Sequence, residues 1–335
     1  MERARAASVW YAGQWAAATR RQWVLRSAGV EGHAVAASVS HTLIACKDHV
    51  LAAGQNAAGE LGGMPDATRW HTRRIEGAVQ HVAAGSNFSW IGNSERMLAC
   101  GTHNRGQLGA LRADGALAHA DVPRVSEIAA GLDHVVVRSG SEVWTCGLNT
   151  DGQLGRSDAG RYDSHMRRVA LPDAERAASV RAGGDTSLAL TENGRMFVWG
   201  NTEYGQALCD SGDQLRTPTA APCDIPLADA RLGGSFVVLR DDDGKVYTAG
   251  YGATATGAGI QRIKQVDLPH AHCIGAGLEM AAAATADGIY VWGLLRTPDG
   301  LRHIARPERI PTDGPGPQKV SALVCTRDAL LALEA

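Results

Sequence analysis

Cysteine and histidine carry the most specific chemistry in this chain, because both bind metals and cysteine also supports redox reactions. The seven cysteines are an odd number without a CxxC pair, which argues against a disulfide framework or a zinc ribbon. The run 270–273 reads His-Ala-His-Cys and could chelate a metal, but on a strand His272 and Cys273 would point to opposite faces. We therefore expect reduced cysteines that pack as small apolar residues, and no metal site.

No group of residues predicts catalysis. The sequence lacks a Gly-x-Ser-x-Gly motif, an HExxH motif and a phosphate-binding glycine loop. Its serines, histidines and aspartates are scattered over different parts of the repeat pattern described below. We expect a protein that is not an enzyme in its own right and needs no cofactor.

The charge balance limits the classes of partner. The chain has 33 basic and 35 acidic side chains, a net charge of -2, so we expect no direct binding of nucleic acid. No apolar stretch reaches about 18 residues, which predicts that no segment spans a membrane. The first ten residues lack the apolar core of a signal peptide, and this favours a cytoplasmic or nuclear location.

The elements that must position any functional side chain repeat along the whole chain. Short apolar runs close on a glycine seven times, at Gly13, Gly54, Gly101, Gly147, Gly200, Gly250 and Gly293. These anchor glycines are 41 to 53 residues apart. A period in the forties, made of short alternating strands, is typical of a propeller blade with about four strands. We predict an all-β fold, a single seven-bladed β-propeller over residues 1–335.

The two ends of the sequence complete one another. Residues 8–13 read as a third strand of a blade, whereas residues 319–324 and 328–333 read as first and second strands that lack a third. One blade is therefore expected to be split between the N- and C-termini, which would close the ring and remove exposed sheet edges.

A polar phrase of the form xNxxGQLG follows four of the anchor glycines, at residues 55–62, 102–109, 148–155 and 201–208. The segments after Gly13, Gly250 and Gly293 lose this turn. On these residues the chain resembles the regulator-of-chromosome-condensation repeat family of seven-bladed propellers. The resemblance covers nearly the whole chain and is specific for the fold; it is less specific for function, because propellers host many activities.

The loops between first and second strands are expected to ring one end of the channel. In the family's chromosome-bound member, which exchanges nucleotide on the GTPase Ran, acidic and histidine side chains of such loops contact the GTPase. We predict that a partner binds the residues Asn87, Phe88, Asp133, His134, Asp185, Phe236 and Glu279, with Trp70 on an inter-blade link. Phe88, Phe236 and Met280 stand where the family usually has histidine, which suggests a more apolar docking surface. The alternative is that these are ordinary solvated loops, with His41 and His134 hydrogen-bonded to the backbone.

Within the family, the chain is similar to the small fungal alpha-tubulin-suppressor, or killer-toxin-insensitivity, type. The resemblance rests on Gly59-Glu60-Leu61, Trp70 and the segment Val82-Ala83-Ala84-Gly85. It implies a scaffold for a small zinc- or iron-binding electron-transfer protein, in tRNA wobble-uridine modification and diphthamide synthesis. The alternative is a guanine-nucleotide exchange factor for a Ran-like small GTPase.

Overall fold

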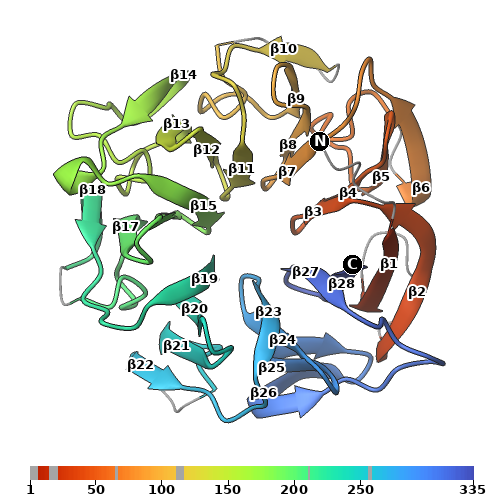
Figure 1. Cartoon of the computed structure of the whole chain (residues 1–335). Coiled ribbons are helices and arrows are strands. Elements are labelled where there is room, and N and C mark those ends of the chain that lie inside the picture. The colour runs from red at the N-terminus through yellow and green to blue at the C-terminus, as the bar shows by residue number, and fades with distance from the viewer. Residues whose placement is uncertain (1–6, 15–21, 65–66, 111–116, 210–211, 256–258) are drawn as a thin grey trace.

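Seven four-stranded antiparallel sheets surround a central channel, as the blades of a propeller (Figure 1). The computed structural model describes residues 7–14, 22–64, 67–110, 117–209, 212–255 and 259–335. Apart from one 3-10 turn, Pro172–Ala174, every regular element in these residues is a strand. The predicted all-β, seven-bladed propeller is confirmed.

Six blades follow one another along the chain, and in each the first strand lies innermost. The first three contain β3 (Ala34–Ala37), β4 (His41–Ala45), β5 (His49–Gly54) and β6 (Ala67–Arg74); β7 (His81–Ala84), β8 (Phe88–Gly92), β9 (Met97–Gly101) and β10 (Ala118–Ala120); and β11 (Glu127–Ala130), β12 (His134–Ser139), β13 (Glu142–Leu148) and β14 (Tyr162–Val169). The next three contain β15 (Ala177–Gly183), β16 (Thr186–Thr191), β17 (Met196–Asn201) and β18 (Gln214–Ala220); β19 (Leu227–Leu232), β20 (Phe236–Asp241), β21 (Val246–Gly250) and β22 (Gln261–Gln265); and β23 (Ala271–Ala276), β24 (Met280–Thr285), β25 (Gly288–Thr297) and β26 (Gly300–Arg309).

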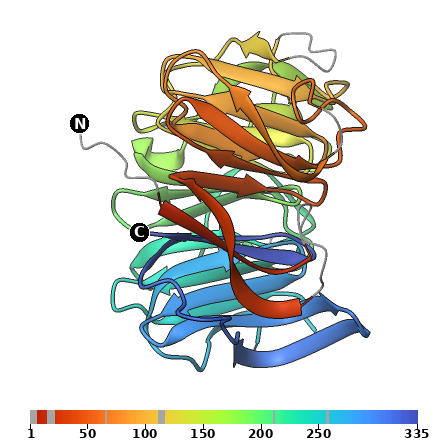
Figure 2. The same ribbon diagram turned by 90° about the vertical axis from the view of Figure 1, so that its right-hand side faces the viewer.

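The seventh blade joins the two ends of the sequence. Its order is β2 (Gln22–Gly32), β1 (Ala7–Gly13), β28 (Ala329–Glu334) and β27 (Val320–Cys325). β1 and β28 pair in antiparallel register from Val9 opposite Leu333 to Gly13 opposite Ala329. Figure 2 shows the long β2 on the outside of this blade. The predicted split blade is confirmed, and its third strand supplies the hydrogen bonds that close the ring.

Each anchor glycine ends a third strand in a backbone conformation that suits only glycine. All seven have positive φ, between +87° and +132°. A Cβ on any of them would overlap a backbone carbonyl at the start of the second strand of the same blade; at Gly147 the Asp133 oxygen would lie 2.5 Å away. Glycine therefore allows the third strand to approach the loop between the first and second strands.

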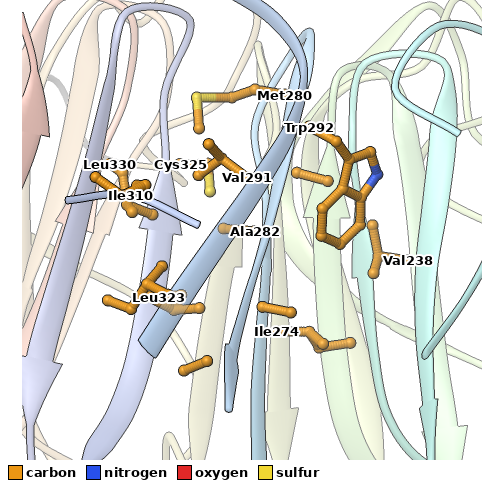
Figure 3. Packing of buried hydrophobic residues seen from close by; sticks show 14 of the residues in the cluster. Val238, Ile274, Met280, Ala282, Val291, Trp292, Ile310, Leu323, Cys325 and Leu330 are labelled. Carbon is orange, nitrogen blue, oxygen red and sulfur yellow. The ribbon is translucent and has the colours of Figure 1, made fainter. Parts of the chain in front are cut away.

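The core consists of side chains packed between neighbouring blades. Figure 3 shows one such cluster, in which Trp292 of one blade lies beside Val238 of the blade before it, and Leu323 and Cys325 of the blade after it belong to the same cluster. Met280 and Trp292 have no exposed surface. No single blade buries both of its faces, so its stability depends on its two neighbours. In the described part of the chain, no helix is long and apolar enough to cross a membrane.

Removal of residues 320–335 should prevent soluble folding, because β1 would lose β28, one of its two neighbouring strands, and the ring would remain open. Solubility, size-exclusion chromatography and thermal melting test this expectation. A circular permutant that starts at Ala34 and joins Ala335 to Ala7 through a short linker keeps all four strands contiguous, and it should fold. A soluble monomeric truncation with unchanged melting would contradict the prediction.

Gly147→Ala should destabilise the fold far more than Gly140→Ala, within one blade. Both glycines have positive φ, but a Cβ at Gly140 would meet no atom within 4 Å. Gly140→Ala is expected to cost about 1–2 kcal/mol from backbone strain. Gly147→Ala adds a clash with the Asp133 carbonyl that costs about 1–3 kcal/mol more. Urea unfolding measures both values, and equal costs would show that the carbonyl contact is unimportant.

Candidate functional site

Seven loop residues form a ring on one end of the propeller, each immediately before a second strand. The ring consists of Ser40, Asn87, Asp133, Asp185, Ser235, Glu279 and Asp328. Each of their carbonyl oxygens accepts a hydrogen bond, 2.8–2.9 Å long, from the amide that follows an anchor glycine. Four of the seven ring residues are carboxylates, and they lie in two pairs of neighbouring blades: Asp133 with Asp185, and Glu279 with Asp328.

Glutamines of neighbouring blades hold two of these carboxylates. Gln107 and Gln153 lie in the polar turns between third and fourth strands and are fully buried. Nε2 of Gln107 donates to Oδ1 of Asp133 at 3.3 Å, and Nε2 of Gln153 donates to Oδ1 of Asp185 at 3.1 Å. Asp133 also forms an ion pair with Arg105. The repeated turn therefore fixes the direction in which the next blade presents its carboxylate.

Asp185 lies in an unfavourable environment for a negative charge. Burial raises the pKa of this carboxyl group above its usual range, and the neighbouring Asp151 and Asp133 carboxylates raise it further. The hydrogen bond from Gln153 and the charge of Arg105 act in the opposite direction. A cation placed here would stabilise the ionised form of Asp185.

In the preceding pair of blades the acid and the amide stand in swapped positions. Glu60 stands at the position of Gln107 and Gln153, and Asn87 stands at the position of the aspartates. Glu60 is fully buried; its Oε2 accepts the Ala58 amide at 2.8 Å, and its Oε1 has no hydrogen-bond partner among the described residues. Asn87 is exposed. In this pair the ring residue is therefore an amide and the turn residue is a buried carboxylate.

The other acidic ring residues lie on the opposite arc. Glu279 is exposed, and its role in partner binding stays a prediction. Asp328 was not among the predicted site residues; it pairs with Arg296 at 2.8 Å and with Arg327 at 3.4 Å. Its position immediately before β28, the second strand of the split blade, could have identified it. The anchor glycine of that blade, Gly13, lies at the other end of the sequence, which hides the relationship.

The expectation that Phe88, His134 and Phe236 form a docking surface is wrong. All three are first residues of second strands and are 0% exposed. Their rings turn inward between the blades and lie so close to a glycine three residues earlier that a Cβ there would overlap them. Met280 is buried at the same position. The face is therefore polar, not apolar, at the predicted residues that solvent can reach.

The two buried histidines at this position bridge neighbouring blades. Nε2 of His41 lies 2.7 Å from the Ser89 hydroxyl, which donates to the Glu60 carbonyl at 2.7 Å. Nε2 of His134 lies 2.9 Å from the Ser187 hydroxyl, which donates to a backbone carbonyl of the preceding turn at 2.9 Å. Burial lowers the pKa of His41 to about 3 and that of His134 to about 4. Both rings are neutral structural links between blades near neutral pH.

Trp70 is not brought together with the ring. It lies on β6, the outer strand of its blade, and is half-buried against the apolar cluster that contains Val9 and Ile44. Trp70 therefore lies on the outer wall of the propeller and not on the loop face. Its role in partner binding stays a separate prediction.

Cys100 and Cys146 pack as buried apolar residues, as their positions in the repeat predict. Burial raises the pKa of both thiols to about 12. His272 is exposed whereas Cys273 is buried, as strand alternation predicts. Among the described residues, no group of three or more histidine, cysteine, aspartate or glutamate side chains could hold a metal ion.

Sequence comparison finds related repeats. Residues 177–206 match the family model for the regulator of chromosome condensation (RCC1) repeat. The chain is 29% identical over 204 residues to the Xenopus laevis regulator of chromosome condensation. This match covers 58% of the chain and 46% of the frog protein. The chain thus spans less than half the length of this curated relative.

Structural comparison finds the same fold over almost the entire chain. Human WBSCR16 superposes with a TM-score of 0.86 at 20% identity and covers 98% of this chain and 99% of its own. Prp20p of Saccharomyces cerevisiae superposes with a TM-score of 0.79 at 18% identity and covers 98% and 91%. The Prp20p structure was described together with its binding properties to Gsp1p and histones. At these identities the likeness establishes the fold.

A His41→Gln, His134→Gln double variant should test the buried histidine links. Because burial lowers both pKa values in the folded state, the unfolded state binds more protons at acidic pH. The wild type should therefore lose stability as the pH falls from about 6.5 to about 4, by up to about 2.7 kcal/mol per pH unit for two protons. Its advantage over the variant should shrink over this range.

Urea unfolding at several pH values measures that difference. The control is His270→Gln, since His270 is exposed. The control should follow the pH profile of the wild type. A constant difference between the wild type and the double variant from pH 7 to pH 4 would contradict a role for these links.

Proposed function

Because the chain is an RCC1-like propeller, we propose that it is a non-catalytic protein-binding platform whose loop face binds a partner with basic side chains. The observation that carries the proposal is the pair of hydrogen bonds from Gln107 and Gln153 to the ring aspartates of the next blade. These bonds fix the carboxylates before any partner arrives. A preorganised charge loses less side-chain entropy when it binds.

Asp185 is the expected centre of this surface. Its carboxylate is held by an amide, not by a cation, and two other aspartates lie near it. An arginine or lysine of a partner would relieve that repulsion while it forms a charge-assisted hydrogen bond. Asn87 and Glu279 would extend the contact to either side.

The first partner class that we propose is a small zinc- or iron-binding electron-transfer protein. The support is the resemblance of the Gly59-Glu60-Leu61 turn and the Trp70 link to the small fungal type. In this role the propeller would orient its partner for tRNA wobble-uridine modification and diphthamide synthesis. The metal would belong to the partner.

The second class is a Ran-like small GTPase, for which the propeller would act as an exchange factor. It is favoured by the acidic ring and by the likeness to Prp20p, which was described with its binding to Gsp1p. An exchange factor must weaken nucleotide binding beside a phosphate site. Carboxylates such as Asp133 and Asp185 could do so by repelling the phosphates and attracting the lysine that binds them.

Affinity purification of the tagged chain, with mass spectrometry of the bound proteins, tests the proposal. The wild type is compared with an Asp133→Ala, Asp185→Ala, Glu279→Ala variant. We expect the variant to lose at least about tenfold of the specific partner, because charged hydrogen bonds at an interface contribute about 1.5–3 kcal/mol each. A small metal-binding protein would support the scaffold, whereas a small GTPase would support the exchange factor.

A matched control removes three exposed acids elsewhere, Asp224→Ala, Asp242→Ala and Asp267→Ala. These residues lie in hairpins and links at the opposite end of the blades. The control keeps the change in net charge but leaves the ring intact, so it should retain the partner. Equal loss in both variants would attribute the effect to net charge, and no loss in either would refute the loop face as the binding surface.

A further inference from the structure

The central channel contains a cavity of about 260 Å³ that is lined by the first strands of all seven blades. Most of its lining is small or apolar. Among the residues that the structure describes, its charged lining residues are Arg181, Arg231 and Arg327, and no carboxylate lines it. The cavity therefore combines a positive wall with an otherwise uncharged interior.

Two of these arginines interrupt a pattern of small residues. Arg181 and Arg231 directly precede the pairs Ala182-Gly183 and Leu232-Gly233 at the ends of their strands. The other five blades have Ala36, Ala83, Ala129, Gly275 and Val324 at this position. The small side chains opposite leave space in front of the two guanidinium groups.

The charges around the channel do not balance. Arg181 pairs with Glu127 at 2.5 Å and with Asp229 at 3.0 Å. Arg231 pairs with the second oxygen of Asp229 at 3.0 Å, and Arg138 lies 3.5 Å from Glu127. Three guanidinium groups thus share two carboxylates, which leaves one positive charge without a counter-charge in this cluster.

Donors in this cluster also remain unused. Nε of Arg181 is buried and has no hydrogen-bond partner among the described residues. Arg231 uses Nη2 for Asp229 and Nε for the Ile274 carbonyl at 3.3 Å. Burial and the charge of Arg181 both lower the pKa of Arg231. An anion in the channel would offset that cost, because it would supply the negative charge that the cluster lacks.

We propose that the channel is a binding site for a small phosphate-bearing anion, held by Arg231 and Arg181. Arg231 uses Nε and Nη2 in the contacts above, so its Nη1 is the donor that a tetrahedral oxyanion would take, while Arg181 adds its positive charge. The cavity is of a size for a small molecule and not for a protein segment. Free phosphate and a phosphorylated small metabolite share this chemistry.

Thermal melting of the full chain with increasing inorganic phosphate, at ionic strength kept constant with NaCl, tests the site. The wild type should show a saturable rise in Tm, since a ligand that binds only the folded state stabilises it. Arg231→Met should raise the apparent Kd at least about tenfold, as expected for the loss of one charged pair. Asp229→Asn should lower it, because the substitution adds net positive charge to the cluster.

Two further variants keep the result interpretable. Arg306→Met removes an exposed arginine of the outer strand β26 and should behave as the wild type. If Arg231→Met fails to fold, Arg231→Lys keeps the positive charge without the guanidinium donors and should weaken binding partially. The same titration with glycerol 3-phosphate identifies the source, since the tighter ligand is the better match. A Tm rise equal to that in NaCl alone, or one unchanged in Arg231→Met and Asp229→Asn, would overturn the proposal.

Discussion

One backbone hydrogen bond, made once in every blade, determines where the candidate site lies. The amide after each anchor glycine donates to the carbonyl of a ring residue, from Ser40 to Asp328. Such a bond contributes only about 1 kcal/mol. Its importance is geometric, because the positive φ of the glycine brings the third strand against the loop and fixes seven side chains at one level. The acidic ring is therefore a consequence of the same contact that shapes the blade.

Strand alternation then separates consecutive residues into two roles. Asp133 precedes β12 and reaches the face, whereas His134 begins β12 and points between blades. The residue type at the first position of these second strands matches the residue that it faces in the next blade. Where it holds histidine, the next blade offers a serine, Ser89 or Ser187; where it holds Phe88, the facing residue is aliphatic. Each of these buried histidines therefore faces a polar residue of the next blade, so its Nε2 has a hydrogen-bond partner.

The sequence predicted the fold well because the period of glycines reflects a local conformation that recurs in every blade. It also placed Asn87, Asp133, Asp185 and Glu279 in one set of loops. It did not predict that Phe88 and Phe236 are buried, since that depends on contacts between neighbouring repeats, such as His41 with Ser89, which are 48 residues apart in sequence. A comparison of the first residue of each second strand with the second residue of the second strand in the next blade would have revealed these contacts. The arginines of the channel were equally hard to predict, because the ion pairs of Arg181 and Arg231 join residues from three different blades.

The net charge of -2 conceals two zones of opposite sign. In four of the seven blades a carboxylate follows the small pair of the first strand and lies on the loop face. Arg181 and Arg231 precede that pair in their own blades and line the channel. A large polyanion that approaches the loop face meets Asp133, Asp185 and Glu279 first and is repelled. A small anion is screened from the ring by solvent over about 8 Å at physiological ionic strength and can enter the channel. The arrangement thus discriminates by size as well as by charge: basic protein surfaces are attracted to the rim, and only small anions reach the arginines.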